Sequence, residues 1–204
     1  MKTRMLLALV ALALTAGRSA AQLSGATNAP SSICFVNVAK ACDLAVLREV
    51  IEQQMPNIIS ANYRLAEVDT FGGMERFDLR KPDARFGKDA KLIVYVVADP
   101  SLPMIACVPG RWSLVNVRGL AKGVEQDKAA YTRRVLKMML KGLAFSVGVG
   151  ANIDTGRCVM SQGSLETLKG IDGTSSSYSP FAAGPIMDIL QEKGLLKPIV
   201  FTEE

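Results

Sequence analysis

Residues 91–98 read KLIVYVVA, which is the strongest strand signal in the sequence. It is a continuous apolar run rich in β-branched residues, which is typical of a strand covered on both faces of its sheet. Shorter apolar runs predict four more strands around it. Two precede it, at Ile33–Val38 and Ile58–Val68, and two follow it, at Met104–Val108 and Trp112–Val117.

Two capped helices are expected among these strands. Asp43 is a candidate N-cap for an amphipathic helix over Leu44–Met55. Asp127 is a candidate N-cap for the longest helix, which runs to about Val147. Apolar and small residues recur in this second helix at steps of three and four, so it buries one face; they are Tyr131, Val135, Met138, Gly142 and Phe145.

The rest of the chain is expected to be less regular. A short C-terminal helix follows Pro185 and ends at Gly194. Residues 69–90 are rich in glycine and charge, and residues 151–180 are rich in glycine, serine and threonine. Both segments are therefore predicted to be mostly loop.

The N-terminus has the pattern of a signal peptide over residues 1–21. Lys2 and Arg4 precede an apolar run that is too short to span a bilayer, and small residues at 19–21 favour cleavage before Gln22. The alternative is an uncleaved N-terminal anchor. We expect cleavage, a flexible leader over residues 22–31, and one domain over residues 32–200.

Export and net charge restrict the classes of partner that the chain is expected to bind. The formal net charge of +5 includes three basic residues of the predicted signal peptide, which contains no acid, so the mature chain is close to neutral. A nearly neutral chain is not expected to bind nucleic acid. The sequence predicts a secreted or periplasmic protein with no membrane span after signal cleavage.

Cys34, Cys42, Cys107 and Cys158 are an even set of cysteines in a protein expected to be exported. Two disulfides are therefore predicted, and three connectivities remain open. No CxxC pair occurs, so a four-cysteine zinc site is not expected.

Residues 141–151 read KGLAFSVGVGA, at the end of the long predicted helix. Their spacing is similar to the HExxHxxGxxH zinc helix of metzincin proteases, in which three histidines bind zinc and the glutamate acts as general base. In that frame Lys141 stands at the first histidine and Gly142 at the glutamate. Phe145 stands at the second histidine and Ala151 at the third ligand. Gly148 matches the glycine of the motif.

The flanking segments extend this resemblance to one branch of the metzincins. Cys158-Val-Met160 resembles the CxM of the archaemetzincin Met-turn, with Met160 as its methionine, and Ser164-Leu-Glu166 resembles the segment after that turn. Residues 112–120 resemble the family's edge strand. The chain therefore resembles archaemetzincins over residues 32–194. The resemblance implies an α+β, α/β/α-like zincin fold. Its twisted, mixed and mostly parallel sheet has an edge strand over the long helix, and a small helical part follows at the C-terminus.

The chain departs from the family at both metal sites. It contains no histidine. The family holds a second, structural zinc with cysteines. In this chain Asn152 stands at the first cysteine position, and Cys158 resembles the second cysteine. The closing CxxC is absent from residues 179–184. We therefore expect no metal, no cofactor and no enzymatic activity, that is, a pseudoprotease.

The remaining function that the resemblance implies is peptide or protein binding by strand addition to the edge strand. The candidate strand consists of Trp112, Ser113, Leu114, Val115, Asn116 and Val117. Lys141 on the cleft floor would attract a carboxylate such as a peptide C-terminus. Packing alone would also explain Phe145 and Met160, and Lys141 would then be a solvated lysine that pairs with an acid such as Asp154.

Two other functions stay open. One is a hydrolase of another class that uses Lys141 and nearby serines, although no SxxK pattern occurs. The other is a structural envelope protein. A cleft in which Lys141 has a lowered pKa would favour the hydrolase, an open apolar groove beside Trp112 would favour the binder, and a filled surface would favour the structural role.

Overall fold

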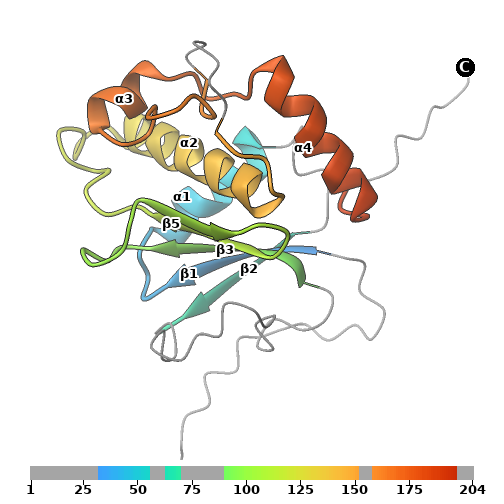
Figure 1. Cartoon of the computed structure of the whole chain (residues 1–204). Coiled ribbons are helices and arrows are strands. Elements are labelled where there is room, and N and C mark those ends of the chain that lie inside the picture. Colours follow the sequence, from blue (N-terminus) through green and yellow to red (C-terminus); the bar gives the residue numbers. More distant parts are fainter. Residues whose placement is uncertain (1–31, 56–62, 70–89, 152–157, 197–204) are drawn as a thin grey trace, which may run out of the picture.

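The computed structural model describes residues 32–55, 63–69, 90–151 and 158–196 (Figure 1). The predicted signal peptide and leader lie outside the described residues, as do residues 70–89 of the expected loop. In the described part of the chain, no helix combines the length and apolar character that crossing a membrane requires.

Five strands form one sheet in the order β2-β1-β3-β5-β4. The stretch KLIVYVVA lies in β3, which pairs in parallel with β1 on one side and with β5 on the other. β2 is also parallel, and only β4 is antiparallel. This mixed, mostly parallel sheet confirms the predicted fold class. The strand bounds are β1 Ser32–Val38, β2 Tyr63–Val68, β3 Ala90–Val97, β4 Ile105–Val108 and β5 Trp112–Asn116.

The described helices lie on one face of this sheet (Figure 1). Because side chains alternate along a strand, Leu92, Val94 and Val96 of β3 enter the core that α1 (Leu44–Glu49) and α2 (Lys128–Ser146) cover. The other face has its own buried cluster, which includes Tyr95, Trp112 and Leu114. Burial on both faces explains why this stretch is apolar from Leu92 to Val97.

The two predicted N-caps are present. The Asp127 carboxylate accepts a hydrogen bond from the backbone N–H of Ala130 at 2.9 Å, and α2 ends before Val147 as expected. The Asp43 carboxylate accepts from the backbone N–H of Ala45 at 2.6 Å. The helix expected over Leu44–Met55 is divided into α1 and a π-helical segment, η1 (Val50–Gln54).

The C-terminal helix begins earlier than predicted. α4 runs over Pro180–Glu192, with Ser179 at its N-cap, and ends before Gly194 as expected. Proline is favoured at the first helical position, and the chain has two candidates. Pro180 takes that position, so Pro185 lies inside the helix. A short helix, α3 (Leu168–Gly173), also interrupts the expected loop.

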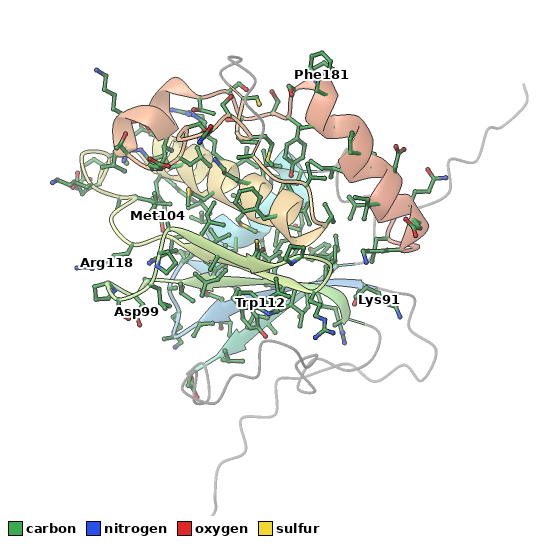
Figure 2. The ribbon with its side chains drawn as sticks, in the orientation of Figure 1. Lys91, Asp99, Met104, Trp112, Arg118 and Phe181 are labelled. Atoms are coloured by element: carbon green, nitrogen blue, oxygen red, sulfur yellow. The ribbon has the colours of Figure 1, made fainter. Side chains whose placement is uncertain are left out.

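The prediction that residues 112–117 form an edge strand is wrong. Residues 112–116 form β5, which pairs with β3 on one side and with β4 on the other, so its backbone cannot accept an added peptide strand. Trp112 also turns to the face opposite the helices (Figure 2). The strand at this border of the described sheet is β4, which the hairpin through Pro109-Gly110 folds back along β5.

The two predicted disulfides are not found. All four cysteines lie in the described residues, and each is a free thiol. Cys34 lies in the cluster on one face of the sheet, whereas Cys42 and Cys158 lie in the core on the other face. An even count of cysteines gives no information on these positions, because pairing requires Cα atoms within about 7 Å of each other.

Candidate functional site

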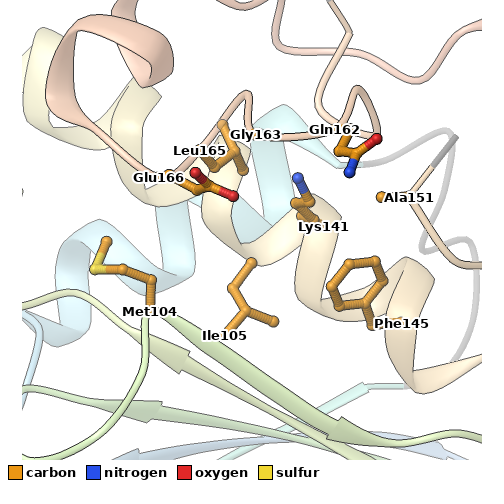
Figure 3. Close-up of a pocket in the computed structure, with 9 residues that line it drawn as sticks. All are labelled: Met104, Ile105, Lys141, Phe145, Ala151, Gln162, Gly163, Leu165 and Glu166. Carbon is orange, nitrogen blue, oxygen red and sulfur yellow. The ribbon is translucent and has the colours of Figure 1, made fainter. Parts of the chain in front are cut away.

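A pocket of about 440 Å³ lies between α2, the start of β4 and the segment after Cys158 (Figure 3). Lys141, Phe145 and Ala151, three positions of the zinc-helix frame, all line it. The other lining residues come from β4 and from the later segment; they are Met104, Ile105, Gln162, Gly163, Leu165 and Glu166. The fold therefore brings together three frame positions that the sequence spacing singled out.

Lys141 is buried, with only 6% of its surface exposed. Its Nζ donates hydrogen bonds to the carbonyl oxygen of Ser161 at 3.2 Å and to Ser164 Oγ at 3.4 Å. It also lies 5.9 Å from the centre of the Phe145 ring, within the range of a cation–π contact. The interpretation of Lys141 as a solvated lysine is therefore wrong.

Burial lowers the pKa of the Lys141 ammonium, and the negative charges of Glu166 and Cys158 oppose that shift. Figure 3 shows the Glu166 carboxylate on the same side of the pocket as the ammonium. An ammonium has three N–H donors. Two are used by Ser161 and Ser164, and within the described residues the third has no acceptor.

Gly142 does not line the pocket, although the frame places it at the general base. It faces the sheet instead, where an added Cβ would collide with Val115 Cγ2 and lie 3.3 Å from Ser113 Oγ. Glycine at this position allows α2 to approach β5. The role of Gly142 is therefore helix–sheet packing.

Gly148 ends α2 and turns the chain back over the pocket. Its φ of +91° lies in the left-handed region, which glycine adopts without steric cost. Backbone N–H groups of Gly148 and Val149 donate to the carbonyls of Phe145 and Ala144, closing the helix. Ala151 follows at the pocket wall.

The segment after Cys158 forms the opposite wall. Met160 is fully buried in the main core, as its packing interpretation requires. Consecutive turns follow, in which Ser164 N–H donates to Ser161 O at 3.2 Å and Ser164 Oγ donates to Val159 O at 3.2 Å. These bonds hold the two lysine acceptors, Ser161 O and Ser164 Oγ, in place.

The Cys158 thiol lies behind this wall, with its Sγ 3.6 Å from Ser161 Oγ. Burial raises the pKa of this thiol. Hydrogen bonds from Ser161, Met160 and Ser179 outweigh burial, so the net pKa is below the ordinary value. The thiolate form of Cys158 is therefore easier to reach than that of an ordinary cysteine.

Two further buried cations of α2 hold the same segment, and the sequence patterns gave no indication of them. Lys137 Nζ donates to Ile171 O at 2.8 Å. The Arg134 guanidinium makes a bidentate pair with Asp172, with both N···O distances 2.7 Å. Because Arg134, Lys137 and Lys141 follow each other at helical spacing, they form one row along α2. Only the last of them reaches the pocket.

The backbone edge of β4 borders the pocket at Ile105. Asn116 N–H donates to Met104 O at 2.8 Å, so these two residues form a hydrogen-bonded antiparallel pair. Hydrogen-bonded and non-bonded pairs alternate along such a ladder. Ala106 and Val108 therefore direct their N–H and C=O groups toward β5, whereas those of Ile105 and Cys107 point outward. Within the described residues no strand pairs with this outer edge.

The residues at the frame positions do not fit a zinc ion. Zinc sites in proteins use thiolate, imidazole and carboxylate donors, whereas these positions provide an ammonium, a phenyl ring and a methyl group. The chain has no histidine, and no group of three or more Cys, Asp or Glu residues converges within the described residues. The chemistry of the pocket therefore depends on Lys141, Gln162 and Glu166.

Two solved structures share this fold. An archaemetzincin from Archaeoglobus fulgidus, crystallised with malonate, has a TM-score of 0.53 and 14% identity, and covers 76% of this chain and 99% of its own. A zinc-dependent peptidase from Methanocorpusculum labreanum has a TM-score of 0.52 and 13% identity, and covers 75% and 99%. No protein-family model and no curated protein matches the sequence. The chain thus has an archaemetzincin-like, zincin-type fold.

This comparison corrects the expectation that the chain is not an enzyme. The fold neighbours are metalloproteins of the peptidase type, one of them described as a zinc-dependent peptidase. Replacement of the zinc ligands bears only on a zinc-dependent mechanism at these positions, and it does not establish inactivity.

Proposed function

We propose that the pocket binds the C-terminal end of an extended peptide, in an archaemetzincin-like protein whose zinc-ligand positions have been replaced. The main observation is Lys141, a buried ammonium in a mostly apolar pocket with one donor that has no acceptor among the described residues. An anionic oxygen is the acceptor that stabilises such a donor most. A peptide carboxylate provides that oxygen.

The shape of the site supports an extended peptide as the ligand. β4 offers outward backbone groups at Ile105 and Cys107, to which a peptide can add as a strand. Ile105 also lines the pocket, together with Met104 and Leu165, so an apolar C-terminal side chain finds apolar partners there. The strand proposed to accept the peptide is therefore β4 and not β5.

Glu166 limits what can bind. Its carboxylate repels a second acid near Lys141, so the peptide is expected to contribute one carboxylate and an apolar side chain rather than an acidic stretch. Gln162 at the rim provides both donors and acceptors for the peptide backbone.

The test compares a peptide library with free C-termini against the same peptides with amidated C-termini. We expect the free carboxylate to bind more tightly, by about 1.5–3 kcal/mol, or roughly ten- to a hundredfold in Kd. Lys141→Met removes this difference, and Lys122→Met, at an exposed lysine, leaves it unchanged. Equal binding of the free and amidated peptides by the wild type contradicts the proposal.

A Ser–Lys hydrolase is the second candidate, and two observations favour it. Lys141 Nζ lies 3.4 Å from Ser164 Oγ, and burial lowers the pKa of the lysine. However, Ser164 does not line the pocket, and its hydroxyl donates to Val159 O. A fluorophosphonate probe distinguishes the candidates: labelling that is lost in Ser164→Ala supports the hydrolase.

We also propose that the protein acts outside the cytoplasm, because of the signal-peptide pattern of residues 1–21. The expected mature N-terminus is Gln22. Sequencing the N-terminus of the exported protein tests this, and a start at Met1 contradicts it.

A further inference from the structure

Lys141 is the one buried lysine of the described residues that reaches the pocket. Lys137 is equally buried, but its Nζ is bonded to Ile171 O at 2.8 Å and does not line the pocket. The exposed lysines are surrounded by water. Among the lysines that the structure describes, Lys141 is therefore the one that is both shielded from bulk water and accessible to a small ligand.

We propose that Lys141 is a nucleophilic amine that forms an imine (Schiff base) with small aldehydes or ketones carrying an apolar substituent. The inference rests on the pocket, and it does not depend on the peptide proposed above. Lysines shielded from water in apolar pockets are the ones that proteins use for this chemistry.

The hydrogen bonds of Lys141 orient its lone pair. In the neutral amine, two N–H groups donate to Ser161 O and Ser164 Oγ, as they do in the structure. Nitrogen is tetrahedral, so the remaining position holds the lone pair. In the ammonium the same position holds the third N–H. The same position on Nζ therefore donates to a carboxylate when Lys141 is an ammonium. It attacks a carbonyl carbon when Lys141 is a neutral amine.

Burial favours the reactive state. It lowers the pKa of the lysine, which increases the fraction of neutral amine at a given pH, although Glu166 and Cys158 oppose this shift. These two groups are also the charged partners that face Lys141 from the later segment. Met104 and Ile105, from the β4 side, are uncharged.

Glu166 lines the pocket together with Lys141 and is the group that moves the protons in this proposal. The Lys141 ammonium first gives a proton to the Glu166 carboxylate. The lone pair of the resulting amine attacks the carbonyl carbon, the C–N bond forms as the C=O π bond breaks, and the oxygen takes the proton from the Glu166 carboxyl group. The nitrogen then loses a proton to the Glu166 carboxylate. Return of that proton to the hydroxyl lets water leave as the C=N bond forms, which leaves a protonated imine and the Glu166 carboxylate. One water is released for each imine, and no atom is oxidised or reduced.

The side chains that line the pocket indicate which aldehydes or ketones can react with Lys141. Met104, Ile105, Phe145 and Leu165 provide apolar contacts, and the pocket of about 440 Å³ is large enough for an aromatic ring. We therefore expect an aldehyde with an aromatic or branched apolar group to react faster than a polar aldehyde of similar size.

The experiment treats the full mature protein with benzaldehyde and sodium cyanoborohydride, which reduces the imine to a stable benzylamine. Peptide mass spectrometry then locates the benzyl groups. At limiting reagent near neutral pH, we expect Lys141 to be labelled severalfold faster than Lys122 and Lys137. The α-amino group, which is also partly neutral there, is identified by its own peptide.

Two controls separate a reactive site from ordinary lysine chemistry. In urea the preference for Lys141 should disappear, because it depends on the folded pocket. Lys141→Arg keeps a cation but cannot form the imine, so its label should be lost while that of Lys122 remains. Glu166→Gln should slow labelling of Lys141 severalfold and leave Lys122 unchanged.

Equal rates for Lys141 and Lys122 in the folded wild type overturn the inference, and this comparison requires no variant to fold. A preference for Lys141 that persists in urea overturns it too. The peptide-binding proposal is judged separately, because loss of the free-carboxylate preference and loss of imine formation are independent measurements.

Discussion

Gly142 of α2 packs directly against Val115 of β5, so closely that a Cβ on the glycine would collide with Val115 Cγ2. This contact sets the distance between the helix that carries Lys141 and the sheet whose strand β4 borders the pocket at Ile105. A small residue is required here for packing, whereas the zinc-helix frame associates the position with a catalytic side chain.

Gly142→Ala should therefore destabilise the protein. Overpacking a tight helix–sheet contact costs about 1–3 kcal/mol, which exceeds the gain of about 1 kcal/mol that alanine brings to a helix interior. Urea unfolding measures the difference. Gly184→Ala is the matched control, since Gly184 lies in α4 with nothing within 4 Å of its added Cβ. The control should be neutral or stabilising, and equal destabilisation by both would contradict the packing role.

Local patterns in the sequence were sufficient for the central strand and the longest helix. KLIVYVVA predicted the central strand, and Asp127 with Gly148 predicted α2 to within about one residue at each end. These signals depend on neighbours in the chain, such as a cap carboxylate and the backbone N–H three residues later. The same holds for Lys141 and Phe145, because one helical turn places both on the same side of α2.

Strand order and contacts between residues far apart in the sequence could not be predicted from local patterns. The hairpin that places β4 outside β5 depends on strand order, which local apolar runs do not encode. The bonds from Lys137 to Ile171 and from Arg134 to Asp172 join residues more than 30 positions apart. Polar heads on an amphipathic helix usually face water, so no local signal marks these cations as buried.

The cysteine thiols provide a direct test of the corrected disulfide prediction. We expect four free thiols per chain in the unfolded protein without any reductant. In the folded protein Cys34, Cys42 and Cys158 should react slowly, because they are buried, whereas the half-buried Cys107 should react first. Alkylation followed by mass spectrometry counts them. A mass increase of fewer than four alkyl groups after unfolding would restore the disulfide prediction.

The lowered pKa of Lys141 predicts a pH-dependent stability. The folded pKa lies below the unfolded value, so the unfolded chain binds more protons between the two values. Stability should therefore rise with pH through that window, and below it the cost of the buried charge is fully present. Lys141→Met removes this contribution. The stability of the wild type relative to Lys141→Met should then be greater near the unfolded lysine pKa of about 10.4 than at neutral pH.

Urea unfolding at the two pH values gives this difference, and other titrating groups cancel because both proteins contain them. Lys122→Met, at an exposed position, should show no comparable change. A difference between the wild type and Lys141→Met that falls with increasing pH would mean that the folded protein stabilises the charged form instead.

The alternation of backbone groups along β4 predicts opposite results for proline at two adjacent positions. The N–H of Ala106 points toward β5, so Ala106→Pro removes a ladder hydrogen bond and should destabilise the fold by about 1–3 kcal/mol. The N–H of Cys107 points outward, where proline is tolerated on an edge strand. Cys107→Pro should therefore fold with nearly wild-type stability and bind an extended peptide more weakly, because one hydrogen bond of the added strand is lost.

Thermal unfolding and peptide titration of the two variants measure both effects. Cys107→Ala controls for loss of the thiol, and wild-type peptide affinity in a folded Cys107→Pro would show that the ligand does not pair with β4.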